Sequence, residues 1–286
     1  MTPVSHTHGA EAERTAQGGL RHVTSDTGQT NISRIANEFV TARRNATALV
    51  DYPGTMPAAL AEAYAMQDAA IALTDKPIAG WKVGRINPPF EGADRLAGPI
   101  FADQTFDAGD TPRAMPVFAG GFAAAEAEFL LRIGAAPDPA KHDYTLAEAT
   151  ALIDRVCVGI EIASSPFGGI NDHGAGVTIS DFGNNNGLVI GADIADWRNL
   201  DLNDWPVELT IDGATTGVAT AATMLDGPFG AARFLFELMA ARGIALSAGQ
   251  WISTGAVSGV HPVEIGANVV AIFDTRLRVE CSISAQ

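Results

Sequence analysis

Three glutamates interrupt two apolar stretches in the middle of the sequence. Glu126 and Glu128 alternate with alanine and phenylalanine, and Glu161 follows a short apolar run. Because successive side chains of a β-strand point to opposite faces, Glu126 and Glu128 would share one face, about 7 Å apart. A buried carboxylate is costly unless it is paired, protonated or bound to a metal ion. The pattern therefore identifies all three residues as candidate metal ligands.

Two neighbouring strands, about 4.8 Å apart, would bring the three carboxylates to one point. Like charges at that distance cannot all stay ionised without a cation. Oxygen ligands favour a hard ion, so Mg²⁺ or Mn²⁺ is expected rather than zinc or copper. Spacing alone leaves an equal alternative, in which Glu126 and Glu128 line a solvated strand face and Glu161 pairs with an arginine.

The elements that would position these residues are mostly strands. From about residue 79 onward, short apolar runs alternate with Gly, Pro, Asn and Asp, which is typical of strands and turns. The expected strands are Gly80–Gly84, Pro99–Ala102, Ala124–Ile133, Cys157–Ile162, Gly187–Ile190, Pro206–Ile211, Gln250–Ser253, Asn268–Phe273 and Arg276–Ile283. Helices are expected near Leu146–Ala151 and over Pro228–Arg242, where proline suits the first turn and Gly243 the position after the helix.

The N-terminal part of the chain has a different character. Residues 1–30 are rich in Gly, Thr, Ser and His, so they cannot bury enough apolar surface to offset the cost of ordering, and a disordered tail is expected. Asn31 has the residue type of a helix N-cap, and a second helix is expected after Pro57. The sequence therefore predicts a tail, a helical segment over 31–78 and a β-rich catalytic core over 79–286, an α+β fold.

Composition excludes several classes of partner. The formal net charge of −15, with no local Lys/Arg cluster, would repel a phosphate backbone, so no nucleic-acid partner is expected. No apolar stretch is long enough to span a membrane, and the N-terminus lacks an apolar signal core. A cytoplasmic protein without a membrane partner is expected. Cys157 and Cys281 lack metal-site spacing and are expected to be buried thiols.

The order of four motifs carries a resemblance to a known family. Gly-Trp-Lys-Val-Gly at 80–84 is followed by Gly-Pro-Ile-Phe-Ala-Asp at 98–103, then by Glu126-x-Glu128 and by Glu161. This order resembles the 2-keto-4-pentenoate hydratase family, within the fumarylacetoacetate hydrolase-like superfamily. Further agreement, which extends the likeness from about residue 31 to 283, lies at residues 62–67, 181–191, 227–228 and 253–255.

The resemblance implies a magnesium site in which Glu126, Glu128 and Glu161 hold the metal, and the metal chelates the carboxylate and 2-oxo oxygens of a substrate. It places Lys82 at the active site, where it would stabilise an enolate or move a proton, aided by the lowering of its pKa on burial. The implied activity is that of a homo-oligomeric lyase, a hydratase that adds or removes water on a small unsaturated or hydroxylated 2-oxo acid. The implied fold is a helical N-terminal segment packed on a mixed β-roll or barrel core.

The sequence departs from the family pattern at two places. The acid that family members carry shortly before the glycine at Gly98 is not at its usual position. Either Asp94 substitutes for it from a shifted position as a catalytic residue, or the role is absent. The family's usual Asp-Asn-Ala/Gly-Ser segment is replaced by Asp-Phe-Gly-Asn-Asn-Asn. Asp181 and Asn184 in this segment are candidate substrate contacts, with a specificity that differs from that for a simple pentadienoate.

The segment Ser253-Thr254-Gly255 is the remaining candidate part of the site. Its hydroxyl and backbone N–H groups could bind the substrate carboxylate, with Thr254 as a catalytic residue and Ser253 and Gly255 as substrate-binding residues. The alternative is that the segment merely ends a strand.

Several other functions remain open at this stage. A 2-oxo acid decarboxylase, similar to 4-oxalocrotonate decarboxylase, shares essentially the same motifs. A 2-keto-3-deoxy sugar acid dehydratase fits the polar run at 184–186. An acylpyruvate hydrolase would need a histidine on a lid, and the sequence has none between His22 and His142. A catalytically dead binding scaffold would be expected to lose a ligand or the lysine first, and all four residues are present.

Overall fold

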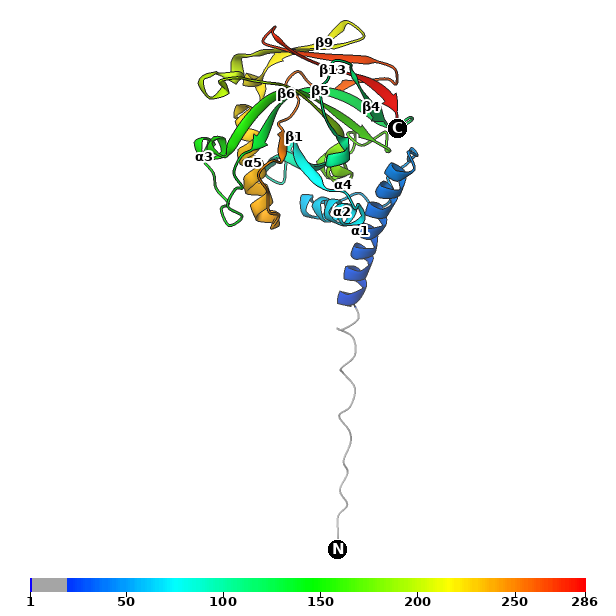
Figure 1. The fold of residues 1–286 in the computed structure, drawn as a ribbon. Helices are drawn as coiled ribbons and strands as arrows, with labels where there is room; N and C mark the ends of the chain where they lie inside the picture. Colours follow the sequence, from blue (N-terminus) through cyan, green and yellow to red (C-terminus); the bar gives the residue numbers. More distant parts are fainter. Residues whose placement is uncertain (2–19) are drawn as a thin grey trace.

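The protein is described by a computed structural model, which covers Met1 and residues 20–286, with the side chains of residues 20–27 excepted. Most of the tail that we expected over residues 1–30 lies outside these described residues. Two β-sheets lie one above the other, and the longer helices lie below and beside them (Figure 1). The architecture is thus a mixed α/β fold.

The larger sheet has eight strands and contains the candidate metal ligands. Its order is β2-β1-β10-β5-β6-β7-β3, with β11 also paired to β5. Most neighbours are antiparallel, whereas β1–β10 and β3–β7 run parallel. The strands are β1 (Ile78–Phe90), β2 (Ala93–Phe101), β3 (Thr105–Asp107), β5 (Phe122–Ile133), β6 (Ile153–Ser165), β7 (Asn185–Asp193), β10 (Trp251–Ser253) and β11 (His261–Pro262).

The smaller sheet covers one face of the larger one. Its order is β4-β13-β12-β8-β9, from β4 (Arg113–Val117), β8 (Pro206–Ile211), β9 (Ala214–Thr220), β12 (Asn268–Phe273) and β13 (Leu277–Ala285). Phe129 of β5 packs edge-on against Phe273 of β12, with ring centroids 5.3 Å apart, inside the main apolar core. Since side chains alternate along a strand, the glutamates flanking Phe129 and Ala127 point away from this core.

Five α-helices and five short 3₁₀ turns complete the described chain. The helices are α1 (Leu20–Arg44), α2 (Leu60–Leu73), α3 (Leu146–Ala151), α4 (Ala175–Ser180) and α5 (Gly227–Arg242). The turns are η1 (Ala102–Gln104), η2 (Phe182–Asn184), η3 (Trp197–Asn199), η4 (Leu202–Asp204) and η5 (Ala221–Thr223). Within the described residues, no helix combines the length and apolarity that crossing a bilayer requires.

The sequence placed most elements correctly but misplaced the start of the first helix. The bounds of β8, β12 and α3 coincide with the expected ranges, whereas β3, β4, β9, β11 and α4 are short elements that we did not expect. Helix α1 begins at Leu20, so Asn31 lies inside it and is not its N-cap. The side-chain amide of Asn31 instead forms two hydrogen bonds with the backbone of Thr55. It therefore binds a loop backbone rather than the N–H groups at a helix start.

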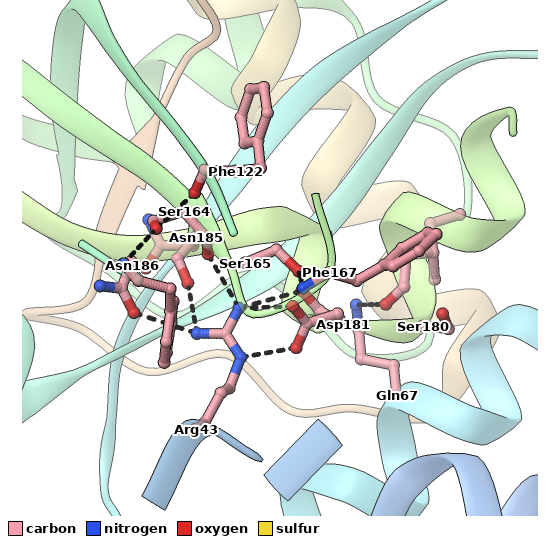
Figure 2. Close-up of polar contacts among 12 residues, drawn as sticks. Arg43, Gln67, Phe122, Ser164, Ser165, Phe167, Ser180, Asp181, Asn185 and Asn186 are labelled. Atoms are coloured by element: carbon pink, nitrogen blue, oxygen red, sulfur yellow. Dashed lines mark hydrogen bonds and ion pairs between the residues drawn. The ribbon is translucent and has the colours of Figure 1, made fainter. Parts of the chain in front are cut away.

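Arg43 joins the end of α1 to the segment that precedes β7 (Figure 2). Its guanidinium donates to both carboxylate oxygens of Asp181, at 2.5 and 2.9 Å, and to Asn186 Oδ1 at 3.1 Å. It also donates to the backbone carbonyls of Asn185 and Ser164. The Asp181 side chain is fully buried and the Arg43 side chain is 10% exposed. This ion pair, together with the bonds to Ser164 of β6 and Asn185 of β7, therefore holds the C-terminal end of α1 against the larger sheet.

We predict that Arg43→Met destabilises the protein by about 3–5 kcal/mol, because it leaves the buried Asp181 carboxylate without its cation. The free energy of unfolding in urea measures the effect. Arg44→Met on the same helix is the matched control, since Arg44 is exposed and donates to a backbone carbonyl instead. Equal stabilities of the two variants would contradict a structural role for the Arg43–Asp181 pair.

Candidate metal centre

The pairing of β5 with β6 brings the three glutamates together. Glu126 lies directly opposite Glu161 in the antiparallel register, and Glu128 is two residues further along the same face of β5. One carboxylate oxygen from each residue lies within 4.8 Å of the other two. Glu128 and Glu161 are fully buried, and Glu126 is 4% exposed. The solvated-strand alternative is therefore wrong for this chain.

The hydrogen bonds of the carboxylates leave two oxygens free. Glu128 Oε2 accepts from Ser253 Oγ at 2.5 Å and from the Gly255 N–H at 2.9 Å, and Glu161 Oε1 accepts from Asn185 Nδ2 at 2.9 Å. Among the described residues, Glu128 Oε1 and Glu161 Oε2 have no hydrogen-bond partner although both are buried. Buried acceptors without a donor are the atoms that a bound cation would satisfy. The residues thus fit a hard divalent ion such as Mg²⁺ or Mn²⁺.

Burial shifts the protonation of two ligands in the metal-free protein. Burial raises the pKa of Glu126 to about 7, although Lys82 opposes the shift. For Glu128, burial and then repulsion from Glu161 and Glu126 raise the pKa well above its ordinary value. Protons and a divalent cation would therefore compete for the same carboxylates.

Lys82 supplies the positive charge of the cluster. It lies on β1 beside Ser253 of β10, and its Nζ is 3.3 Å from Glu161 Oε1 and donates to Asn184 Oδ1 at 3.4 Å. Burial alone would lower its pKa, but Glu161, Glu126 and Glu128 outweigh burial and raise it. The expectation of a lowered pKa is thus wrong for the metal-free site, where Lys82 is an ammonium. With all three carboxylates ionised, the formal charge is −3 + 1 = −2, which one divalent ion would neutralise.

A cavity of about 940 Å³ opens onto this cluster. Its lining includes five of the residues that the sequence singled out, namely Lys82, Glu126, Asn184, Thr254 and Gly255. Asn184 is held in place by Asn171, which also lines the cavity, because the Asn184 Nδ2 donates to Asn171 Oδ1 at 3.1 Å. The Thr254 hydroxyl donates to the Phe129 carbonyl, so it is engaged with the backbone rather than free for catalysis.

Three expected site residues lie elsewhere or act differently. Asp181 is held by Arg43 and does not line the cavity, so the structure does not place it in contact with a substrate. Asp94 is half exposed and its carboxylate lies 3.5 Å from Arg95, away from the three glutamates, because it precedes the buried part of β2. Ser253 lies behind Glu128 and orients that ligand instead of facing the cavity.

The sequence reasoning missed residues that support the site from a distance. Asn185 donates a hydrogen bond to Glu161. It belongs to the polar run at 184–186, but the sequence did not indicate that it supports a glutamate. Arg43 gave no signal, because its partner Asp181 is 138 residues away. Arg85 and Arg95 also line the cavity, and neither belongs to a motif that we recognised.

Comparisons with known proteins establish the fold. No family profile matches the chain. A 108-residue segment is 28% identical to 4-oxalocrotonate decarboxylase from Pseudomonas sp. (strain CF600) and covers 38% of this chain but only 39% of that relative. Among solved structures, 4-oxalocrotonate decarboxylase from Pseudomonas putida G7, complexed with magnesium and adipate, matches with a TM-score of 0.74 and 19% identity over 89% of this chain and 98% of the other.

A second solved structure shows the same fold with another activity. Fumarylpyruvate hydrolase from Pseudomonas aeruginosa, in complex with Mn²⁺ and pyruvate, matches with a TM-score of 0.56 and 16% identity, over 75% of this chain and 94% of the other. The chain therefore has a fumarylacetoacetate hydrolase-like fold, which it shares with metal-containing decarboxylases and hydrolases. In this chain, the three buried glutamates are the group that could bind a metal of that kind.

We predict that Glu128→Gln weakens Mg²⁺ binding at least about 100-fold, since loss of a ligand charge costs more than loss of a supporting hydrogen bond. Calorimetric titration of Mg²⁺ measures the change. Thermal unfolding of the metal-free variant should be nearly unchanged near neutral pH, because the raised pKa keeps Glu128 protonated and the uncharged amide replaces an uncharged acid. Glu264→Gln, at an exposed position, is the control and should bind as the parent does. Equal affinities of both variants would exclude Glu128 as a ligand.

Metal binding should also depend on pH. Glu126 and Glu128 hold protons up to and above neutral pH in the metal-free protein, and bound metal must displace these protons. The apparent affinity for Mg²⁺ should therefore rise as the pH is raised from about 6 to about 8, with net proton release. Titrations in two buffers of different ionisation enthalpy measure the released protons. Heats that are independent of the buffer would contradict protonated ligands.

Proposed function

We propose that this chain is a divalent-metal-dependent lyase that acts on a small 2-oxo acid. The observation that carries the proposal is the buried glutamate cluster, with unsatisfied oxygens and an adjacent ammonium, beside a cavity that Glu126 and Lys82 line. A bound divalent ion would act as a Lewis acid toward the 2-oxo and carboxylate oxygens of such a substrate. The cavity volume of about 940 Å³ lies within the range of small-molecule sites.

Lys82 is the residue that we expect to act on the substrate. Its ammonium group lies at the cavity wall, 3.3 Å from Glu161, so it can stabilise negative charge that develops on a substrate oxygen. As an ammonium it can also donate a proton to the carbon adjacent to the carbonyl carbon that bears this oxygen. Asn184 accepts one Lys82 donor and is itself held by Asn171, which restricts the direction of the ammonium group.

Loss of CO₂ is the reaction that the site supports best. When a carboxylate that is conjugated with the 2-oxo group leaves as CO₂, the electron pair of the broken C–C bond passes into the enolate of that group, where positive charge would stabilise it. A proton from Lys82 would then take the place of the lost CO₂ on carbon. Among the described residues that line the cavity, Glu126 is the sole carboxylate, and it belongs to the metal cluster. The similarity to 4-oxalocrotonate decarboxylase, over nearly the full length of the solved structure, agrees with this choice.

Addition or removal of water is the second candidate reaction. A hydratase or a sugar-acid dehydratase needs a base near the water molecule, and His173 at the cavity rim is the group that could provide it. His173 is exposed and stacks on Phe167, with ring centroids 6.0 Å apart. An acylpyruvate hydrolase would depend on the same histidine. A dead scaffold would have no reason to keep both the glutamates and Lys82.

The proposal predicts magnesium-dependent binding of oxalate and a catalytic loss in Lys82→Met. Calorimetry should detect oxalate binding only with Mg²⁺, and a screen of unsaturated 2-oxo acids should release CO₂, measured by a coupled bicarbonate assay. Lys82→Met should lower kcat by about 10²–10⁴-fold, as expected for loss of a proton-transfer group. Binding of Mg²⁺ should not weaken, because the variant removes a competing cation.

Lys76→Met is the matched control, since Lys76 is exposed and pairs with Asp103 on the surface. Its kcat should equal that of the parent. Oxalate binding that is indifferent to Mg²⁺ would overturn the proposed function. Formation of a hydroxylated 2-oxo acid without CO₂ would replace decarboxylation with hydration.

A further inference from the structure

Three successive residues next to Lys82 have a left-handed backbone. The φ angles are 57° at Phe182, 63° at Gly183 and 58° at Asn184. Glycine adopts this conformation freely and asparagine tolerates it, whereas a bulky side chain such as that of phenylalanine rarely does. Such strain persists where the surrounding structure enforces it, and it gathers at functional sites. This left-handed turn, Phe182–Asn184, is therefore a candidate for a function.

Neighbouring elements hold the left-handed turn in place. Asp181, which precedes it, is fixed by Arg43 (Figure 2). The Phe182 ring packs edge-on against Phe101 of β2, with ring centroids 5.1 Å apart. A Cβ at Gly98 of β2 would overlap the Phe182 carbonyl, so the backbone of β2 lies directly against the turn. The strain is thus offset by an ion pair, an aromatic contact and the close packing of two backbones.

The left-handed turn contacts both the aliphatic part and the ammonium group of Lys82. A Cβ at Gly183 would lie 3.2 Å from Lys82 Cδ, so the turn packs against the aliphatic part. Lys82 Nζ donates to Asn184 Oδ1 at 3.4 Å, and Asn184 Nδ2 donates to Asn171 Oδ1 at 3.1 Å. Within the described chain, Glu161 is the other oxygen partner of the ammonium, at 3.3 Å. One of the three ammonium donors therefore remains for a molecule in the cavity that Lys82 and Asn184 line.

Lys82 needs a neutral partner as well as Glu161. A lysine side chain is long and flexible, and fixing its ammonium in one direction costs conformational entropy. A divalent ion among the glutamates would attract the Glu161 carboxylate and repel the ammonium, which would weaken their ion pair. The Asn184 amide carries no net charge, so it would keep its hydrogen bond to Lys82 when the charge of the cluster changes. Asn184 is therefore the partner suited to hold Lys82 during a reaction.

We propose that the left-handed turn holds the Lys82 ammonium in the direction that the reaction requires, with Asn184 as the positioning residue. The inference rests on the proposed function, because it assumes that Lys82 acts on the substrate. It gives the backbone strain a purpose, since the turn brings the Asn184 amide oxygen to Lys82 Nζ while its backbone supports the aliphatic part of the lysine. Asn184 acts through Lys82 and takes no part in metal binding.

The first test is a double-mutant cycle of Asn184→Gly and Lys82→Met, measured as kcat for the 2-oxo acid that the parent converts. Glycine keeps the left-handed backbone without strain and removes only the amide. Asn184→Gly alone should lower kcat by about 10–10²-fold, as expected for a misplaced catalytic group, with little change in KM. In the Lys82→Met background it should have no further effect, because the effects of residues that act through one group are not additive.

The second test needs no turnover. Lys76, Lys82 and Lys141 are the lysines of the chain, and their side chains are 45%, 5% and 34% exposed, respectively. Nuclear magnetic resonance of the lysine ammonium groups in the metal-free protein should therefore show one slowly exchanging signal, which Lys82→Met removes. Asn184→Gly should speed the exchange of this signal with water by at least about tenfold, as expected for the loss of a hydrogen bond to a charged group.

Asp196→Gly is the matched control, because Asp196 is exposed, has a similar φ of 54° and does not line the cavity. It should keep the kcat and the ammonium exchange of the parent. Asn171→Ala, which removes the partner of the Asn184 amide, should change both quantities in the same direction as Asn184→Gly but by less. Asn171 is exposed, so this variant tests the inference even if Asn184→Gly does not fold.

Two sets of outcomes separate the inference from the proposed function. Unchanged kcat or unchanged ammonium exchange in Asn184→Gly, or an equal loss of kcat in both backgrounds, would overturn the inference and leave the proposed function standing. A parent that binds no oxalate with Mg²⁺ and converts no 2-oxo acid would overturn the proposed function, and with it the role of Asn184 in catalysis.

Discussion

Three buried carboxylates at adjacent positions of two paired strands are the constraint on which the rest of this structure depends. Glu126 and Glu161 are direct register partners, and Glu128 shares their face of the sheet. Removing such groups from water costs several kcal/mol for each charge, and their mutual repulsion adds to the cost. The surrounding residues reduce this cost only in part, since Lys82 supplies one positive charge and two carboxylate oxygens have no donor among the residues that the structure describes.

The positions of the glutamate carboxylates are set by strand pairing rather than by loops. Glu128 is oriented by Ser253 from β10, on one side of the glutamate-bearing pair, and Glu161 by Asn185 from β7, on the other. The helices contribute indirectly, because Arg43 of α1 fixes Asp181 and with it the turn that leads into β7 (Figure 2). A site built on paired strands is more precise than one built on loops, which suits a metal with strict distance requirements.

The sequence singled out the three glutamates that the structure brings together, and most of the strands, because both depend on local alternation, as at Glu126 and Glu128. It could not predict the register that places Glu161 opposite Glu126, since register depends on the whole sheet. For the same reason Asp181 was assigned to the substrate, although its partner Arg43 lies far away in the chain. The long-range ion pair and the two arginines that line the cavity leave no periodic signal in the sequence.

The cost of burying three carboxylates beside a single ammonium group indicates that the cluster serves a purpose other than stability. Replacing a buried ionic group by apolar residues of similar volume often stabilises a protein, so a cluster whose formal charge is −2 when all three carboxylates are ionised is not explained by stability. Lys82 cannot balance it, because one ammonium opposes three carboxylates and leaves Glu128 Oε1 without a partner. Protons can neutralise the negative charge only by binding to the carboxylates themselves, in line with the raised pKa of Glu126. A divalent cation would satisfy the charge and the unpaired oxygens together, and would leave Lys82 available to a substrate.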